Sequence, residues 1–186
     1  MEQSAVGVGR PTDHEQGSAG GFFSFPNPVN EYAARTVAAG VVVMAVVALA
    51  VPAPWMLIPL TYGFWARVLT GPRLSPLGQL ATRVVAPRLS AQPKLTPGPP
   101  KRFAQAIGVA FTTGAVILWA TVGWDAAAWL IGALAVAAFL ESAFGLCLGC
   151  RVFAVLMRLG VIPESVCEEC ADLSRRHPEL RHSTTA

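Results

Sequence analysis

Charged side chains are scarce in this sequence, and their scarcity narrows the class of protein. Only 13% of the 186 residues are Asp, Glu, Lys or Arg, whereas 53% are hydrophobic. At a mean hydropathy of +0.50, a domain of this size could not cover its surface with polar groups as soluble domains do. The composition therefore excludes an ordinary soluble domain and predicts an integral membrane protein.

Two further absences bear on the function. The sequence contains no glycine-rich phosphate loop and no serine–histidine–acid set. It also has no cysteine before residue 147, so all four cysteines fall in one short C-terminal stretch. These absences leave open whether the protein is an enzyme, and they make the cysteines the main candidates for chemistry.

The hydrophobic residues form four runs, about 32–51, 55–70, 103–124 and 126–149. A bilayer core of about 30 Å needs roughly 20 residues of helix. We therefore expect an all-α fold in which residues 25–160 form one bundle of four transmembrane helices. Asn27 is expected to cap the first helix, with Pro28 in its first turn. Residues 1–24 and 161–186 are expected to form a disordered N-terminal tail and a cysteine-containing cytoplasmic tail.

Positive charges predict the orientation of the helices. The link between the second and third runs, residues 71–102, has no acidic residue and carries the bases Arg73, Arg83, Arg88, Lys94, Lys101 and Arg102. Cytoplasmic loops of membrane proteins show such an excess of Lys and Arg. We expect a multi-pass protein of the cell inner membrane with both termini in the cytoplasm. Thiols are kept reduced there, so a stable structural disulfide is not expected.

The same link has apolar residues near helical spacing, namely Leu74, Leu77, Leu80, Val84 and Val85. With arginines between them, they predict an amphipathic segment on the inner membrane surface, limited to about three turns by Pro76 and Pro87. Anionic lipid is the expected partner. Nucleic acid is not, because no aromatic residues are interleaved with the bases.

The cysteines form two C-x2-C pairs, Cys147 with Cys150 and Cys167 with Cys170. If the last hydrophobic helix is interrupted at about Gly149, the first pair stands at a helix N-terminus, which favours a reactive thiolate. If the helix runs straight through, this argument lapses. Our leading hypothesis is a thiol–disulfide or sulfane-sulfur relay. The first pair would exchange, and the second would act as the shuttle or resolving pair.

Two alternatives use the same residues differently. Sixteen residues separate the pairs, a spacing that fits a four-cysteine zinc site. All four cysteines would then hold zinc or an iron–sulfur cluster that fixes the tail to the bundle. A third possibility is a sulfur-compound transporter or a passive membrane subunit.

Glu141 is the clearest acidic residue inside a predicted membrane helix. Ionisable groups at such depth face the bundle interior or a partner, because burying an unpaired charge is costly. We expect an ion pair with Arg35 or Arg67, both near the cytoplasmic ends of their helices. Proton or substrate handling by Glu141 is the other possibility.

Two short motifs carry a family resemblance. They are Phe25-Pro26-Asn27-Pro28-x-x-Glu31 before the first helix and Gly145-x-Cys147-Leu148-Gly149-Cys150 after the last. With the proline-broken basic link, they resemble an uncharacterised bacterial membrane family, a domain of unknown function, over about residues 22–170. The resemblance implies four membrane helices and a thiol or sulfur role for Cys147 and Cys150. It also implies a thioredoxin-like or sulfurtransferase partner, because genes for such proteins lie near those of the family.

Overall fold

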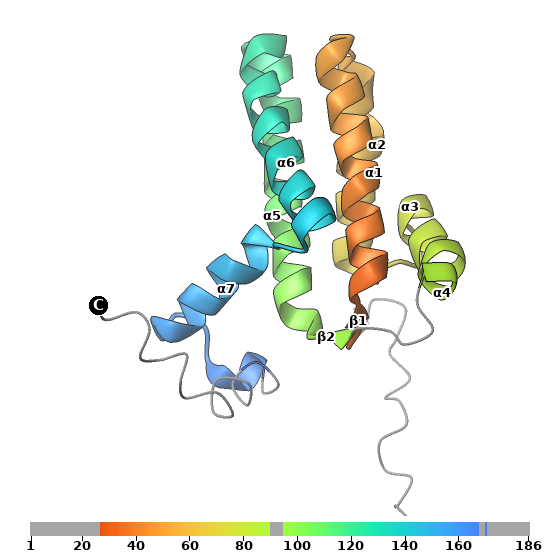
Figure 1. Ribbon diagram of the computed structural model, residues 1–186. Coiled ribbons are helices and arrows are strands. Elements are labelled where there is room, and N and C mark those ends of the chain that lie inside the picture. The colour runs from red at the N-terminus through yellow and green to blue at the C-terminus, as the bar shows by residue number, and fades with distance from the viewer. Residues whose placement is uncertain (1–26, 90–94, 168–169, 171–186) are drawn as a thin grey trace, which may run out of the picture.

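We describe a computed structural model of the chain over residues 27–89, 95–167 and 170. Four long helices stand side by side (Figure 1): α1 (Glu31–Ala50), α2 (Leu57–Thr70), α5 (Gly98–Thr121) and α6 (Trp124–Phe144). The expected all-α fold is confirmed, apart from two strands of two residues each. The predicted tail 1–24 and most of the predicted tail 161–186 lie outside the described residues.

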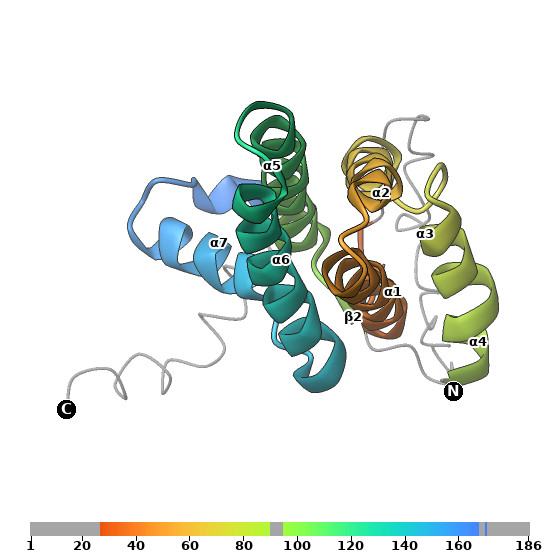
Figure 2. The same cartoon turned by 90° about the horizontal axis from the view of Figure 1, so that it is seen from above.

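Two helical hairpins make up the bundle. The 3₁₀ turn η1 (Pro54–Met56) precedes α2, and Gly123 separates α5 from α6. Seen from above, α1 and α2 form one side and α5 and α6 the other (Figure 2). The main contacts run between the hairpins, because α1 packs on α6 and α2 packs on α5. The buried core where they meet is aliphatic, with Phe64 as its one buried aromatic among the described residues.

Within the described part of the chain, three helices are long and apolar enough to cross a membrane: α1, α5 and α6. The second predicted span is the shorter α2, which has 14 residues. The fourth predicted span, 126–149, is longer than the helix found there, because α6 ends at Phe144. Gly145 follows with φ +70°, and the N–H groups of Gly145 and Leu146 donate to the carbonyls of Glu141 and Leu140. This glycine-based termination is a standard helix stop.

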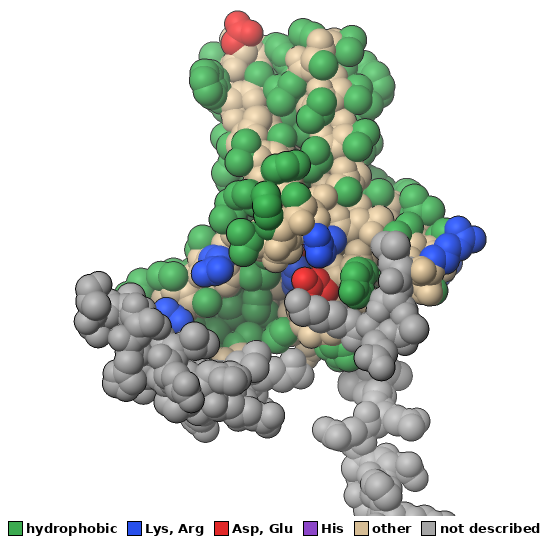
Figure 3. Space-filling view, in the orientation of Figure 1, with side chains coloured by type: hydrophobic (Ala, Val, Ile, Leu, Met, Phe, Trp, Pro, Cys, Tyr) green, Lys and Arg blue, Asp and Glu red, His purple; other side chains and the backbone are tan. Residues whose placement is uncertain are grey.

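Apolar side chains cover the outside of the bundle as well as its core (Figure 3). Large hydrophobic residues remain exposed along each long helix, among them Val43, Ile58, Trp129 and Val136. A continuous exposed apolar surface of this kind marks contact with a membrane or a partner. The apolar helices are therefore consistent with contact with the lipid bilayer.

The basic link folds into a helical run along the lower part of α1. It consists of α3 (Pro76–Leu80), the π-helical turn η2 (Ala81–Val85) and α4 (Ala86–Leu89). The predicted helical segment is thus confirmed, but Pro87 lies inside the run and does not end it. A proline ring clashes with the carbonyl four residues earlier in an α-helix, and the wider π turn lies where that clash would occur.

A strand clamp ties the starts of the two hairpins together. Strand β1 (Val29–Asn30) pairs antiparallel with β2 (Leu95–Thr96), with Val29 opposite Thr96. The Asn27 side chain accepts a hydrogen bond of 2.8 Å from the N–H of Gly98, at the start of α5. The expectation that Asn27 caps the first helix was therefore wrong. Asn30 caps α1 by accepting from the N–H of Tyr32, because the clamp keeps residues 29 and 30 extended.

Candidate functional site

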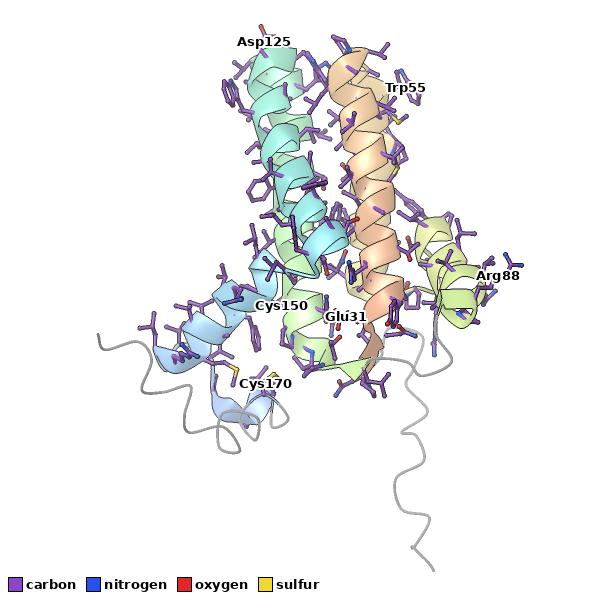
Figure 4. The ribbon with its side chains drawn as sticks, in the orientation of Figure 1. Glu31, Trp55, Arg88, Asp125, Cys150 and Cys170 are labelled. Atoms are coloured by element: carbon purple, nitrogen blue, oxygen red, sulfur yellow. A yellow bond between two sulfur atoms is a disulfide. The ribbon has the colours of Figure 1, made fainter. Side chains whose placement is uncertain are left out.

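The first cysteine pair lies where α6 ends and α7 (Leu148–Arg158) begins. Cys147 is the N-cap residue of α7, and Cys150 lies in its first turn. Of the two alternatives left open by the sequence, the structure therefore contains the interrupted helix, although the break falls at Gly145 and not at Gly149. The backbone N–H groups of the first turn favour negative charge nearby. Figure 4 shows Cys150 at the end of the bundle opposite Trp55 and Asp125.

Gly149 holds α7 close against α5. A Cβ atom at this position would lie 2.6 Å from the Cα atom of Ala104 on α5, so the two backbones approach as only a glycine permits. One turn further along α7, the Phe153 ring packs on Phe103 with 5.5 Å between centroids. The position of the cysteine pair is thus set by α5 as well as by the end of α6.

Cys147 is buried and Cys150 is half-buried, and both carry free thiols. The pKa of the Cys147 thiol lies below its usual value, mainly because the Cys150 thiol donates a hydrogen bond to it. The Lys101 ammonium and the backbone N–H of Cys150 act in the same direction, against burial and the charge of Glu141. The same thiol–thiol hydrogen bond, together with burial, raises the pKa of Cys150. Of the two thiols, Cys147 is therefore the more readily ionised, and the thiolate is the reactive form of cysteine.

This asymmetry gives a pH dependence that can be measured. A lowered pKa keeps thiolate present at lower pH, so Cys147 should react with methyl methanethiosulfonate with a half-maximal rate below about pH 8.5, the usual cysteine value. Peptide mapping by mass spectrometry would give the rate at each site, and Cys150 should react more slowly. Cys150→Ala removes the donated hydrogen bond and should move the Cys147 midpoint upward. An unchanged midpoint in that variant would contradict the assignment.

Glu141 forms its ion pair with a residue that we did not expect. Its Oε1 atom lies 2.6 Å from the Nζ atom of Lys101, on the first turns of α5, and both side chains are largely buried. The predicted pairing with Arg35 or Arg67 was wrong. Arg35 instead donates from Nε and Nη2 to the carbonyls of Ser142 and Ala143, where it satisfies the end of α6. From the sequence, Lys101 stood out only as one of the basic residues of the link 71–102.

Arg67 is buried on the last turn of α2 and has neutral partners. Its Nε atom donates to the Gln105 side-chain oxygen at 2.8 Å, and Nη1 donates to the Ser75 hydroxyl at 3.3 Å. The guanidinium group also lies over the Phe64 ring, 4.5 Å from its centroid. Sequence reasoning missed Gln105, because an isolated glutamine in an apolar helix predicts no partner.

A cavity of about 320 Å³ connects these groups. Its polar lining comes from Arg67, Gln105, Glu141 and Cys147, while apolar residues of α1, α2, α5, α6 and α7 line the remainder. The cavity thus lies between the helices and reaches Cys147. Arg67 of α2 and Cys147 at the start of α7 therefore line the same cavity.

The second cysteine pair is separate from the first. Cys167 and Cys170 form a disulfide with each other, and Cys167 is buried. Among the described residues, which include all four cysteines, no three His, Cys, Asp or Glu side chains gather as metal ligands. The expectation that the thiols stay reduced does not hold for this pair. Because the bridge closes a loop of only four residues, it restricts the unfolded chain less than a long-range disulfide would.

Comparison with known proteins agrees with the family resemblance. No curated protein and no solved structure matches the chain. A family model does match, over residues 29–158, which is more than half of the sequence. The matched region includes all the long helices, Lys101, Glu141 and the first cysteine pair, and it ends before Cys167. The chain therefore belongs to the family described as a domain of unknown function, DUF4395.

Proposed function

We propose that this protein is a thiol–disulfide or sulfane-sulfur relay at the cytoplasmic face of the cell inner membrane. Cys147 is the attacking thiolate and Cys150 the resolving thiol. Cys167 and Cys170 form the shuttle pair, and their disulfide is its oxidised form. The observation that carries the proposal is the position of two free cysteines, Cys147 and Cys150, at the start of α7, with a lowered Cys147 pKa.

The exchange balances with no further reagent. The Cys147 thiolate attacks one sulfur of a disulfide, forms a mixed disulfide and releases the other sulfur as a thiolate. Cys150 then loses its proton and attacks the Cys147 sulfur, which releases the second thiolate and leaves a Cys147–Cys150 disulfide. Two electrons pass from the pair to the disulfide that was attacked. That disulfide belongs either to the shuttle pair or to a thioredoxin-like or sulfurtransferase partner.

Four membrane crossings, not three, fit this proposal best. Residues 54–70 of η1 and α2 together cover roughly 27 Å, from about 2.0 Å per residue of 3₁₀ helix and 1.5 Å per residue of α-helix. That length is close to a bilayer core of about 30 Å. Every described Lys and Arg lies toward the end of the bundle where α1 and α5 begin, while Asp125 lies at the other end (Figures 3 and 4). The positive-inside rule then puts the cysteines and both termini in the cytoplasm.

Trapping with a small disulfide tests the relay. We expect Cys150→Ser to accumulate a mixed disulfide at Cys147 when the purified full chain is treated with 2-hydroxyethyl disulfide, because nothing resolves it. In the wild-type protein, Cys150 should resolve the mixed disulfide, so that an internal disulfide forms and no adduct accumulates. Cys147→Ser should form adducts roughly tenfold more slowly. Intact-mass spectrometry distinguishes these products.

The control removes the second pair alone. A Cys167→Ser, Cys170→Ser double variant should still close the Cys147–Cys150 disulfide, which shows that the first pair acts by itself. Equal adduct formation in Cys147→Ser and Cys150→Ser would refute the assigned roles. If only the double variant failed to react, the exchange would be assigned to the second pair.

A further inference from the structure

One nitrogen of the buried Arg67 side chain lacks a hydrogen-bond partner. Arg67 is 5% exposed, and no atom of the described residues accepts a hydrogen bond from its Nη2. Its other contacts are an amide oxygen, a hydroxyl group and an aromatic ring, none of which carries a charge. Buried donors and charges are normally satisfied, because leaving them unpaired costs free energy. The missing partner is therefore an acceptor, and a negatively charged acceptor would add to the effect that the Glu141 charge already has on Arg67.

The ionisable groups around the cavity leave this charge unbalanced. Glu141 is the one carboxylate that lines it, and its Oε1 atom is engaged by Lys101 at 2.6 Å. With the thiols of Cys147 and Cys150 protonated, the set of Arg67, Lys101 and Glu141 carries one excess positive charge. A Cys147 thiolate would neutralise the set, but the cavity between the two residues would still leave Nη2 without an acceptor. With Cys147 protonated, the site thus has the charge for a small anion; once Cys147 ionises, the unpartnered Nη2 donor of Arg67 is what still favours one.

Arg67 and Gln105 also line a second cavity of about 250 Å³, which extends from the first toward the strand clamp and α3. The guanidinium group therefore lies on a wall that two cavities share. One cavity contains Cys147, and the other has Lys101 and the α3 residue Gly78 in its lining. An anion in the first cavity would share it with Arg67 and Cys147, and the buried Nη2 atom would have to turn toward it.

We propose that Arg67 binds a small sulfur oxyanion in this cavity, with Gln105 fixing the guanidinium group and the outer sulfur of the anion directed at Cys147. This inference rests on the proposed relay and names its substrate class. With thiosulfate, the Cys147 thiolate attacks the outer sulfur, and the sulfur–sulfur bond breaks. The bonding electron pair leaves on sulfite, and Cys147 keeps the transferred sulfur as a persulfide. Arg67 is a binding residue that compensates the charge of the oxyanion throughout this step.

Sulfate is the first probe, because it has no transferable sulfur and reports binding alone. We expect calorimetry on the full chain in phosphatidylcholine nanodiscs to detect sulfate binding, and Arg67→Gln to weaken it by roughly 10-fold to 100-fold, as for loss of a charged hydrogen bond. Arg67→Lys, which keeps the charge, should weaken it less. The exposed Arg158 lies outside both cavities, so Arg158→Gln should bind sulfate as the wild type does.

A second readout needs no variant. Sulfate in the cavity should slow methyl methanethiosulfonate labelling of Cys147 in the wild-type protein, with a midpoint at the same concentration as the calorimetric one. No binding up to tens of millimolar, equal binding by Arg67→Gln, or labelling that sulfate does not slow would each overturn the inference. This readout stands even if Arg67→Gln fails to fold.

The phosphate of a lipid headgroup is also an oxyanion that could pair with Arg67. Nanodiscs containing phosphatidylglycerol distinguish a headgroup from a soluble oxyanion. Sulfate binding that persists in them supports a soluble oxyanion, whereas its loss there would show that a headgroup occupies the site and overturn the proposal. Failure of the relay is recognised separately. If sulfate binds but Cys150→Ser traps no mixed disulfide, the relay is rejected and the anion site is kept. If the mixed disulfide is trapped but sulfate does not bind, the anion site is rejected and the relay is kept.

Discussion

Replacing Lys101 with methionine is expected to destabilise the protein by about 3–5 kcal/mol. The ammonium group of Lys101 is the direct partner of Glu141, and the side chains are only 10% and 15% exposed. Methionine keeps the length of the side chain but leaves the carboxylate buried without its partner. Thermal unfolding in detergent, followed by tryptophan fluorescence, would measure the loss.

The double variant Lys101→Met, Glu141→Leu is the decisive comparison. Removing both charges of a buried pair is often close to neutral, whereas removing one is not, so the double variant should recover most of the stability. The neighbouring Arg102, which is exposed and donates to the Val68 carbonyl, provides the control Arg102→Met with a small effect. A Lys101→Met variant as stable as the wild type would mean that Glu141 is neutral or hydrated in the folded protein.

Gly149→Ala should move α7 and disturb the cysteine pair. The added methyl group would meet the Cα and Cβ atoms of Ala104 at 2.6 and 2.5 Å, and a backbone atom cannot turn aside as a flexible side chain can. Overpacking of this kind costs typically 1–3 kcal/mol. We expect the displaced α7 to expose Cys147, so that methyl methanethiosulfonate labels it several-fold faster.

Gly132→Ala is a matched control on α6. A Cβ atom at this glycine meets nothing within 4 Å, so the same substitution should leave both stability and Cys147 labelling near the wild-type values. If Cys147 were labelled faster in both Gly149→Ala and Gly132→Ala, the cause would be a general loosening of the helices. Wild-type labelling in Gly149→Ala would show that α7 does not depend on its close approach to α5.

Sequence patterns predicted the helices well because each helix is specified locally. The apolar runs, the prolines after α1 and the glycine near residue 123 mark most of the helix boundaries within a few residues. The error at the end of α6 has a similar origin. The apolar residues continue through Leu146 and Leu148, so hydropathy alone hides the stop that the left-handed conformation of Gly145 imposes. The first pair of cysteines was found from its spacing, but only the structure decided between the interrupted helix and the continuous one.

Pairing between helices was the part that the sequence could not predict. Glu141 had several cations at a compatible depth, and the choice among them depends on how the hairpins pack. Because α1 packs on α6, Arg35 reaches the carbonyls at the end of α6, and Lys101 of α5 is left to bind Glu141. The unsatisfied nitrogen of Arg67 is likewise visible only when all its neighbours are in place.

The strand clamp couples the orientation of the second hairpin to the orientation of the first. Its two strands are separated by more than sixty residues, since Val29 pairs with Thr96. During synthesis, β1 therefore emerges long before β2, and the pairing can close only if α1 and α5 start on the same side of the membrane. A chain whose second hairpin inserted upside down would leave β1 and the Asn27 side chain without partners. If the hairpins cross a membrane as proposed, the clamp thus favours the correctly inserted protein over the inverted one.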